Sequence, residues 1–535
     1  MNLETRLKHH SHQEIWEYYC SFLNLDLTQY MAIQNRLMKE QINLWSNCEL
    51  GQSILKGKTP ETVEEFRREV PLTTYEDYAD ILLRKKGDAL PDNPVIWIET
   101  TWEGGEKPIK VAPYTRAMLD VYKTNAAACM ILATSEERGT FDIDTSYKFL
   151  YGLAPLPYAT GILPLVIGEE ISIGFLPPVE KAQAMSFSER NKLGFKMALK
   201  DDVEYFFGLG SVTYAISKSI GSMGSSTGSE SRLKTIMNLS PKMVLRILNA
   251  NRKCKSENRP LKPKDLFRLK GFMVAGTDNN CYKDELEDLW GIRPMEVFAG
   301  TEPTLVGTET WTRKGMYFFP DSCFYEFIPE EEMLRNFEEP DYKPDTLLMD
   351  EVLPGRLYEI VITVLKGGAF ARYRVGDMYR CIGLTNKEDG TRLPRFEYVD
   401  RVPSVIDIGG FTRITKTSIH NAIELSKIDV ADWVARKEFT ENNKPYMHLY
   451  LELKPDAMVT GATTKEVLGE VLSAYFKYKD NDYIDLRKIL GMDPLKISII
   501  KAGTFKAYKK HYKRTIGKMN PNKYEIGALL GAQKL

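Results

Sequence analysis

The stretch from Gly355 to Thr415 decides how this chain folds. It reads GRLYEIVITVLKGGAFARYRVGDMYRC over residues 355–381, then a polar turn, then PRFEYVDRVPSVIDIGGFTRIT over residues 394–415. Apolar and polar side chains alternate from Leu357 to Val364, which predicts a strand. Gly367-Gly368 predicts a tight turn, and a second strand follows from Arg372. The segment therefore predicts a β-hairpin.

Asp377 is the candidate binding residue of this hairpin. Gly376 permits a sharp backbone bend, so we expect Asp377 to project from the end of its strand instead of lying in the sheet. Two nearby arginines, Arg372 and Arg374, are expected to hold the carboxylate, which could then accept hydrogen bonds from a vicinal diol such as a ribose. An Arg–Asp ion pair on a hairpin explains the same residues, and both interpretations stay open at this point.

The length, composition and net charge of the chain limit the class of protein to which it can belong. With 535 residues, the chain should hold more than one domain, and 43% hydrophobic and 27% charged residues are ordinary for a soluble globular protein. The net charge of −1 excludes a strong global field toward nucleic acid or an anionic membrane. The seven cysteines lack metal-ligand spacing, and no apolar run reaches about 18 residues. We expect a cytoplasmic protein with neither a nucleic-acid nor a membrane partner.

Hydrophobic periodicity predicts alternating helices and strands. Helices are expected over residues 13–56, from the capped start at Thr62, from Arg116, over Ser418–Leu425 and over Lys465–Lys477. Strand regions are expected at Ile96–Lys107 (running into a Gly turn), Ile109–Thr115, Phe149–Pro157 with Gly161–Pro164, Ile171–Leu176, Tyr205–Gly210, Gly271–Asp278, Pro294–Ala299, Phe318–Pro329, His448–Leu453 and Leu495–Ile500.

The Gly- and Ser-rich run from Gly221 to Glu230 has the composition of a phosphate loop. It follows the helical stretch Val212–Ile220 instead of a hydrophobic strand, and the Gly-Lys-Ser/Thr signature is absent. We interpret it as a flexible surface linker. A second interpretation, that it supplies hydroxyls to a phosphate site, stays open.

Several motifs taken together resemble a known superfamily. Tyr-Arg-x-Gly-Asp (373–377), an aromatic strand ending in Asp-Arg (400–401) and Gly-Gly-Phe-Thr-Arg-Ile (409–414) resemble the late motifs of the acyl-adenylate-forming enzymes. The runs FRREVPLTTYEDY (66–78) and FFPDSCFYEFIP (318–329) are similar to those of the auxin-responsive (Gretchen Hagen) family of acyl acid–amido synthetases within it. Phenylacetate–coenzyme A ligases have a looser version of the first run.

This resemblance implies an α/β fold with two domains. Residues 1–400 would form a large ATP- and acyl-acid-binding adenylation domain with β-sheets flanked by helices, and residues 401–535 a small, mobile C-terminal α/β lid. Arg401 would sit at the hinge. The segment Phe206–Ser211 matches the family region that lines the acid, although most of its apolar residues fit a plain core equally well.

The resemblance also assigns the nucleotide site. Asp377 would bind the ATP ribose, and the small-residue turns Gly276-Thr277 and Gly300-Thr301 would contact the nucleotide. Glu302 would bind Mg²⁺, for which a hard carboxylate is suited. Lys523 would be the catalytic lysine, with Lys506, Lys509, Lys510, Lys513 and Lys518 as competing lysines of the same tail.

The phosphate loop departs from the family pattern. Gly104-Gly105 and the trailing Pro-Tyr-Thr (113–115) match it, but the hydroxyl part does not, because Trp102 and Glu103 stand where a glycine and a threonine are expected. The candidate phosphate-binding residues are Thr100, Thr101, Gly104, Gly105, Lys107 and Lys110. An acidic side chain beside a polyphosphate is repulsive unless Mg²⁺ or a lysine intervenes.

The implied reaction uses ATP and Mg²⁺ to convert a small-molecule carboxylic acid into an acyl adenylate. The acyl group then passes to an amine, as of an amino acid, or to coenzyme A in the ligase branch. A nucleotide-binding protein with a degenerate phosphate loop is a third interpretation. A monomer and a homodimer are both compatible with the sequence.

Overall fold

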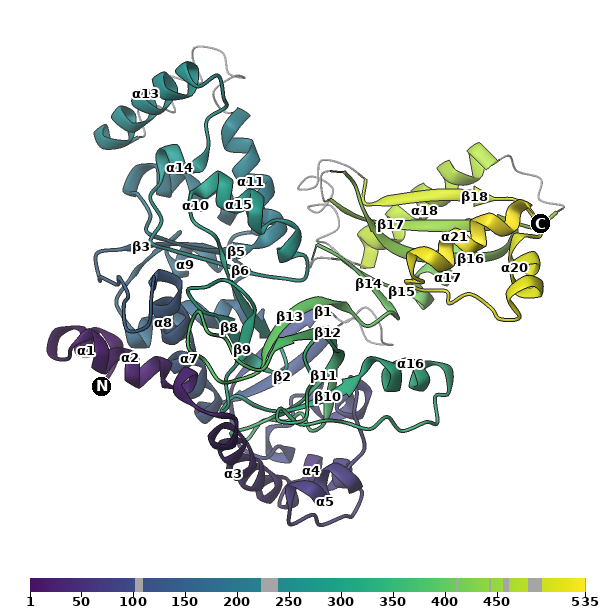
Figure 1. Cartoon of the computed structure of the whole chain (residues 1–535), viewed down its shortest axis with the longest axis horizontal. Helices are drawn as coiled ribbons and strands as arrows, with labels where there is room; N and C mark the ends of the chain where they lie inside the picture. Colours follow the sequence, from purple (N-terminus) through teal and green to yellow (C-terminus); the bar gives the residue numbers. More distant parts are fainter. Residues whose placement is uncertain are drawn as a thin grey trace. The chain divides into compact units, whose positions relative to one another are not determined.

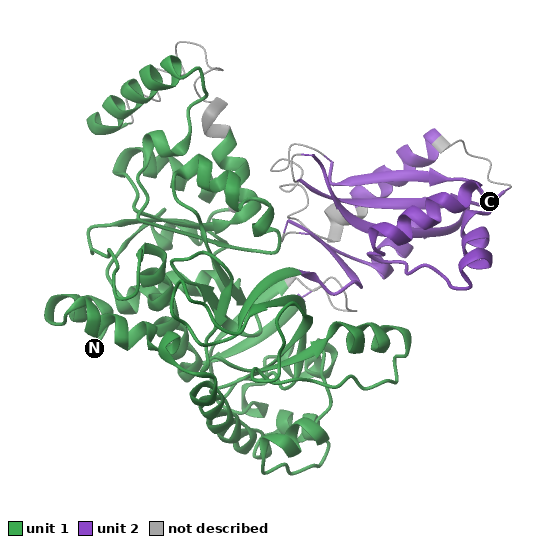
Figure 2. Cartoon of the chain, viewed as in Figure 1, with its two compact units in different colours: residues 1–100, 110–399 green, residues 101–109, 400–535 purple. Residues whose placement is uncertain are grey.

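A computed structural model describes residues 1–101, 109–222, 239–409, 412–441, 444–455, 461–479 and 493–534. The chain divides into two compact units, coloured separately in Figure 2. The larger unit comprises Met1–Thr100 and Lys110–Val399, and the smaller one Thr101–Ile109 and Asp400–Leu535. Within the described residues, no helix combines the length and the apolar character needed to cross a membrane.

A sheet of eleven strands, counted over the described residues, forms the centre of the larger unit (Figure 1). Its order is β10-β11-β12-β13-β9-β8-β7-β6-β5-β3-β4. One end is parallel and consists of β4 (Gly174–Leu176), β3 (Lys148–Gly152), β5 (Tyr205–Leu209), β6 (Gly271–Ala275) and β7 (Met295–Gly300). The carboxyl ends of these strands therefore share one edge of the sheet, which is where open α/β sheets bind ligands.

The rest of the sheet turns antiparallel from β8 onward. It consists of β8 (Thr304–Glu309), β9 (Met316–Phe318), β13 (Arg395–Arg401), β12 (Tyr373–Gly383), β11 (Leu357–Val364) and β10 (Cys323–Pro329). The predicted hairpin is confirmed, because β11 pairs antiparallel with β12. A separate two-stranded sheet joins β1 (Pro94–Thr101) to β2 (Ile109–Thr115).

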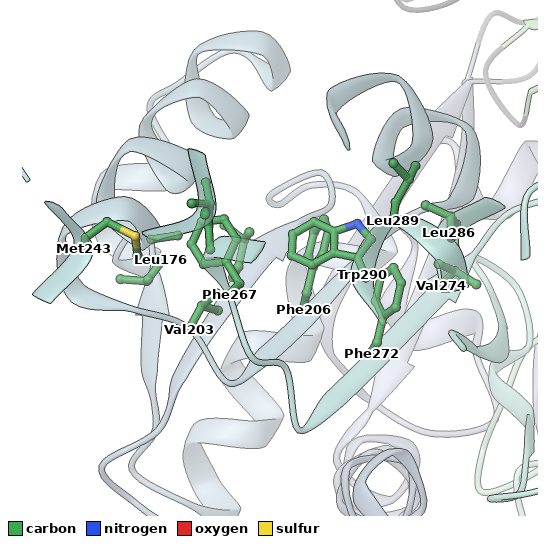
Figure 3. Packing of buried hydrophobic residues seen from close by; sticks show 14 of the residues in the cluster. Leu176, Val203, Phe206, Met243, Phe267, Phe272, Val274, Leu286, Leu289 and Trp290 are labelled. Carbon is green, nitrogen blue, oxygen red and sulfur yellow. The ribbon is translucent and has the colours of Figure 1, made fainter. Parts of the chain in front are cut away.

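Helices cover both faces of the parallel strands. Phe206 of β5 enters a buried cluster with Phe272 and Trp290, where its ring lies 5.5 Å from the Phe272 ring and 5.2 Å from the Trp290 ring (Figure 3). The indole N–H of Trp290 donates to Ser217 Oγ over 2.8 Å. The polar atom of this buried ring is therefore hydrogen-bonded, and its burial carries no penalty for a lost hydrogen bond. This face carries α10 (Phe187–Asp201), α11 (Gly210–Ser222), α13 (Pro241–Ser256), α14 (Pro263–Leu266) and α15 (Lys283–Trp290).

The opposite face meets α7 (Arg116–Thr134), which starts at Arg116 as predicted and has Thr115 as its N-cap. Tyr205, the neighbour of Phe206 on β5, donates a hydrogen bond to Met130 O of this helix, as the alternation of side chains along a strand requires. The other helices among the described residues of the unit are α1 (Leu3–His9), α2 (His12–Cys20), α3 (Leu27–Ser46), α4 (Glu49–Leu55), α5 (Val63–Glu69), α6 (Ala79–Leu82), α8 (Leu163–Glu170), α9 (Val179–Ala182) and α16 (Glu330–Glu338).

Two local predictions have clear outcomes. The capped start at Thr62 is confirmed, because its hydroxyl accepts from the backbone N–H of Glu65 while the Glu65 carboxylate accepts from the N–H of Thr62. The assignment of Gly161–Pro164 to a strand region is wrong: a 3₁₀ turn ends at Ile162 and α8 begins at Leu163. Pro164 stands in the first turn of α8, where its fixed φ and missing N–H suit a helix.

Over its described residues, the smaller unit is built on a three-stranded sheet of β16 (Val430–Phe439), β17 (Pro445–Leu453) and β18 (Leu495–Ile500). One face packs on α17 (Lys416–Ser426) and α18 (Gly461–Lys479), and the other on α20 (Thr504–Tyr512) and α21 (Lys523–Gly531). A hairpin of β14 (Val405–Ile408) and β15 (Thr412–Thr415) precedes α17. The predicted α/β class with a smaller C-terminal domain is confirmed.

Candidate functional site

Two small-residue turns follow neighbouring parallel strands at the shared edge. Gly276 comes directly after β6 with φ of +116°, a backbone conformation that glycine adopts without strain. The Asn279 side chain donates to Gly276 O over 2.8 Å. At the end of β7, the Tyr114 hydroxyl lies 3.2 Å from Gly300 O and 2.9 Å from Thr301 O. Both turns are therefore fixed by side chains, with Gly276 exposed and Thr277 and Thr301 half-buried.

Glu302 lies beside them in a cluster of three polar side chains. Its Oε1 accepts hydrogen bonds from Lys110 Nζ over 2.8 Å and from the Tyr373 hydroxyl over 2.7 Å. Lys110 Nζ also donates to the Tyr373 oxygen over 2.8 Å and lies 5.5 Å from the centre of the Tyr75 ring. The three residues come from β2, from the turn after β7 and from the start of β12, so the fold assembles a charged cluster from distant parts of the sequence.

The electrostatics keep this cluster ionised. Burial alone would raise the pKa of Glu302, which is 9% exposed, but the charge of Lys110 and the hydrogen bonds from Lys110 and Tyr373 outweigh it and lower the pKa to about 2. Burial and the Glu302 carboxylate together hold the pKa of Tyr373 well above its usual range. At neutral pH Glu302 is therefore a carboxylate and Tyr373 a neutral phenol.

A single carboxylate of this kind suits Mg²⁺. The part of the chain that the structure describes gathers no group of three or more His, Cys, Asp or Glu residues for a metal. Mg²⁺ does not need one, because it is commonly held by one or two carboxylates together with substrate phosphates and waters. Glu302 fits that requirement.

Asp377 is buried, at 3% exposure, inside a strand. The prediction that it projects from a strand end is wrong, because β12 runs on from Tyr373 to Gly383. The bend that the sequence indicated is nevertheless present: Gly376 has φ of +80°, and the register against β11 shifts between Glu359 and Val361. This bulge turns the local direction of side chains without ending the strand.

The two arginines near Asp377 have other partners than predicted. Arg372 reaches Glu326 with Nε and Nη2, over 3.0 and 2.9 Å. Arg374 reaches Glu359 with Nε and Nη2, over 2.8 and 2.6 Å. Both are two-point charge-assisted pairs. The Arg374–Glu359 pair links the neighbouring strands β12 and β11, whereas the Arg372–Glu326 pair joins the residue before β12 to β10. The expectation that these arginines hold Asp377 is therefore wrong.

A small apolar cavity lies directly beneath the turns. Its volume is about 50 Å³, and Ala275 and Ala299, which immediately precede Gly276 and Gly300, form part of its wall. Phe207 lines it, whereas Phe206 belongs to the core of Figure 3. The remaining lining residues are Tyr122, Ala126, Cys129, Met130, Tyr151, Leu153, Thr160, Leu163, Ile167, Met273, Val297 and Leu305.

The predicted phosphate loop is described only in part. Thr100 is half-buried near the end of β1, and the backbone of Thr101 completes that strand. Gly104, Gly105 and Lys107 lie outside the described residues, as do Trp102 and Glu103. Of the Gly- and Ser-rich run, Gly221 and Ser222 end α11, and the residues after them are likewise outside the description.

Arg401 and Lys523 belong to the smaller unit. Arg401 ends β13, with Nε 3.9 Å from Oδ2 of the fully buried Asp407. Lys523 is exposed as the first residue of α21, a helix that the sequence analysis did not predict. The signal was present, because Asn522 and Glu525 form a capping box at its start.

The competing lysine Lys518 is held in place instead. Its Nζ pairs with Asp432 and lies 5.6 Å from the centre of the Trp433 ring and 5.5 Å from that of Phe505. Its backbone carbonyl accepts from the N–H of Ala435, which adds the tail to β16. These contacts favour a structural role for Lys518. Lys506, Lys509, Lys510 and Lys513 are exposed in or just after α20.

Comparison with known proteins now decides the family. The GH3 family N-terminal domain matches residues 20–198, its central domain residues 316–401 and its C-terminal domain residues 415–526. This chain belongs to the GH3 family. The predicted resemblance to that family is thereby confirmed.

Among curated relatives of this GH3 protein is a jasmonoyl–L-amino acid synthetase, GH3.5, of Oryza sativa subsp. japonica. It is 28% identical over 206 residues, which cover 36% of this chain and 33% of the relative. A probable indole-3-acetic acid-amido synthetase of the same plant, GH3.9, is 28% identical over 201 residues, covering 35% of this chain and 42% of the relative. The chain thus matches about a third of the length of the first of these relatives.

Two solved structures share the fold of this GH3 protein over most of both chains. AtGH3.15 acyl acid amido synthetase in complex with 2,4-DB has a TM-score of 0.51 at 17% identity, covering 96% of this chain and 95% of its own. 2-Hydroxyisobutyryl-CoA ligase in complex with 2-HIB-AMP and CoA has a TM-score of 0.54 at 16% identity, covering 88% and 86%. The GH3 protein therefore has the fold found in both.

Proposed function

We propose that this GH3 protein is an AMP-forming ligase that activates a carboxylic acid as an acyl adenylate and transfers the acyl group to the amine of an amino acid. The observation that carries the proposal is the cluster of Glu302, Lys110 and Tyr373, placed at the carboxyl edge of the parallel strands and above an apolar cavity. Its two curated relatives are named as amino acid synthetase and amido synthetase, which supports an amine acceptor.

The reaction has two steps. A carboxylate oxygen attacks the α-phosphorus of ATP, the bond from that phosphorus to the bridging oxygen breaks, and pyrophosphate leaves. The amine nitrogen then attacks the acyl carbonyl carbon, the bond to the AMP oxygen breaks, and the amine releases a proton. The first step joins two anions, so fixed positive charge near the phosphates lowers its barrier.

Each of the candidate residues has a separate role in this reaction. Lys110 places an ammonium group beside the proposed polyphosphate site, with Thr100, Thr101, Gly104 and Gly105 as the accompanying loop. Glu302 would hold Mg²⁺, which neutralises phosphate charge when bound. The turns Gly276-Thr277 and Gly300-Thr301 contact the nucleotide, and the cavity beneath them takes the acyl group.

The two units would then have separate tasks. We assign ATP and acid binding to residues 1–400, and a lid that carries Lys523 to residues 401–535, with Arg401 at the hinge between them. A cytoplasmic setting is consistent with seven free cysteines, six of them buried. Monomer and homodimer both accommodate this scheme.

Asp377 is assigned to the ribose of ATP, and its replacement should weaken ATP binding. Losing two charge-assisted hydrogen bonds is expected to cost about 2–4 kcal/mol. Isothermal titration of Asp377→Ala with ATP and with tripolyphosphate separates the causes, because tripolyphosphate has no ribose and should lose nothing. Unchanged ATP affinity in a folded variant would show that the ribose assignment is wrong.

Acid-dependent exchange of pyrophosphate into ATP tests the whole proposal. Exchange should appear with some members of a panel of carboxylic acids, and an amide product should form when amino acids are added. A product with coenzyme A but none with amino acids would instead identify an acyl–coenzyme A ligase. If no acid supports exchange while ATP still binds, the chain is a nucleotide-binding protein with a degenerate phosphate loop.

A further inference from the structure

A second cavity shares part of its wall with the proposed acyl cavity. Its volume is about 20 Å³, enough for one small polar group, and it shares the wall residues Tyr151 and Leu153 with the first cavity. Both residues lie at the carboxyl end of β3. The other lining residues are mainly apolar: Pro155, Leu156, Gly161, Pro164, Phe175, Pro177, Val179, Ala182, Gln183 and Arg190.

Arg190 is the charged residue among the described walls of this second cavity. It belongs to α10 and is only 1% exposed, although burying a guanidinium in apolar surroundings is costly. The burial lowers its pKa to about 10, so the group still carries its charge at neutral pH. The fold therefore maintains a positive charge in the wall of a cavity that is otherwise mainly apolar.

We infer that Arg190 binds a second carboxylate on the acid substrate, so that the enzyme acts on short dicarboxylic acids. One carboxylate would react at the nucleotide turns, the alkyl part would lie against Tyr151 and Leu153, and the distal carboxylate would meet the guanidinium. Arg190 also interacts within the protein, but a guanidinium carries five N–H donors, so an internal contact and a two-point carboxylate contact can coexist. This inference rests on the proposed acid-activating function.

Chain-matched acids test the inference. Succinate against butanoate, and adipate against hexanoate, differ only in the distal carboxylate. In acid-dependent pyrophosphate exchange, the parent protein should prefer the diacid by roughly 10- to 100-fold in kcat/KM, the range expected for a charge-assisted hydrogen bond. Arg190→Met, which keeps length and apolar packing, should abolish or invert that preference. Arg252→Met on the exposed surface of α13 is the matched control and should retain it.

A second variant covers the case in which Arg190→Met does not fold. Gln183→Glu keeps the arginine but adds a carboxylate to the same cavity wall, where charge repulsion should lower kcat/KM for a diacid more than for its chain-matched monoacid. Equal use of diacids and monoacids by the parent protein, or a diacid preference that survives in both variants, would overturn the inference.

The failure of the inference can be told apart from failure of the proposed function. Calorimetric titration of the same four acids in the presence of AMP measures binding without any chemistry. Diacid binding that depends on Arg190, with no exchange from any acid, would support the subsite and reject the ligase. Exchange with monoacids alone would support the ligase and reject the subsite.

Discussion

Glu302→Gln is expected to lower the rate of acyl-adenylate formation by roughly 10²–10³-fold, the size of effect seen when one preorganised electrostatic contact is removed from a transition state. The glutamine keeps the shape of the side chain and its hydrogen bond to Tyr373 but loses the charge. Single-turnover formation of pyrophosphate at saturating ATP measures this step directly. The Mg²⁺ concentration that gives half the maximal rate should rise in the variant, because Glu302 is the proposed metal ligand.

Glu180→Gln, an exposed glutamate in α9, is the matched control and should leave both quantities unchanged. An unchanged Mg²⁺ dependence in Glu302→Gln, together with an unchanged rate, would reject the metal assignment. A reduced rate without a shift in the Mg²⁺ dependence would indicate that Glu302 acts by positioning Lys110, to which it is bonded over 2.8 Å.

The Glu302 carboxylate should also make the free energy of unfolding depend on pH under acidic conditions. Its folded-state pKa of about 2 lies below the ordinary value of 4.5, so the stabilisation is fully present above pH 4.5 and is lost as the pH falls toward 2. A shift of that size corresponds to about 3 kcal/mol. Urea unfolding of the parent and of Glu302→Gln should therefore show a stability difference that narrows between pH 5 and about pH 2.5. A constant difference over this range would contradict the lowered pKa.

Lys110→Met probes the other half of the pair. Each single variant leaves one buried charge without its counter-charge, whereas the double variant removes both. The double variant should therefore be less destabilised than the sum of the two single variants. Additive losses would mean that Lys110 and Glu302 stabilise the fold independently of each other.

Local sequence patterns predicted the fold because each one follows from a local physical rule. The alternation from Leu357 to Val364 gave β11, and the buried run after Gly271 gave β6 with its turn at Gly276. Thr62 and Thr115 start helices because their hydroxyls satisfy backbone N–H groups at the first turn. In the smaller unit β16 escaped prediction, since its charged stretch Arg436–Glu438 hides the alternation of a strand.

Partnerships between distant side chains could not be predicted in this way. Lys110 and Glu302 are 192 positions apart, and a sequence alone does not say which cation meets which carboxylate. The same limit explains the error at Arg372 and Arg374, which both stand near Asp377 in sequence. The pairing of β11 with β12 places Glu359 beside Arg374, and the fold places Glu326 of β10 beside Arg372. The burial of Arg190 could not be predicted from the sequence, because a lone arginine in a helix is ordinarily a surface residue.

Lys523→Ala should abolish acyl-adenylate formation, with a loss of roughly 10²–10³-fold or more, yet leave transfer from a supplied acyl adenylate largely intact. The reason is that only the first step brings two anions together. The location of Lys523 supports this assignment: as the first residue of α21 it meets the positive end of the helix dipole, where a lysine weakens the helix. A lysine at such a position is better explained by function than by stability.

The Lys523→Ala variant should therefore lose adenylation activity without losing stability. Removing an exposed lysine from a helix start should change the free energy of unfolding by no more than about 0.5 kcal/mol, and in the stabilising direction if at all. Lys509→Ala and Lys510→Ala, two exposed lysines of α20, are matched controls that should keep both half-reactions. Equal loss of the two half-reactions in Lys523→Ala, or loss of adenylation in a control, would assign the catalytic role to another lysine. Lys506 and Lys513, which are exposed in the same tail, would then be the next candidates to test, because Lys518 is held by Asp432 and packed against Trp433.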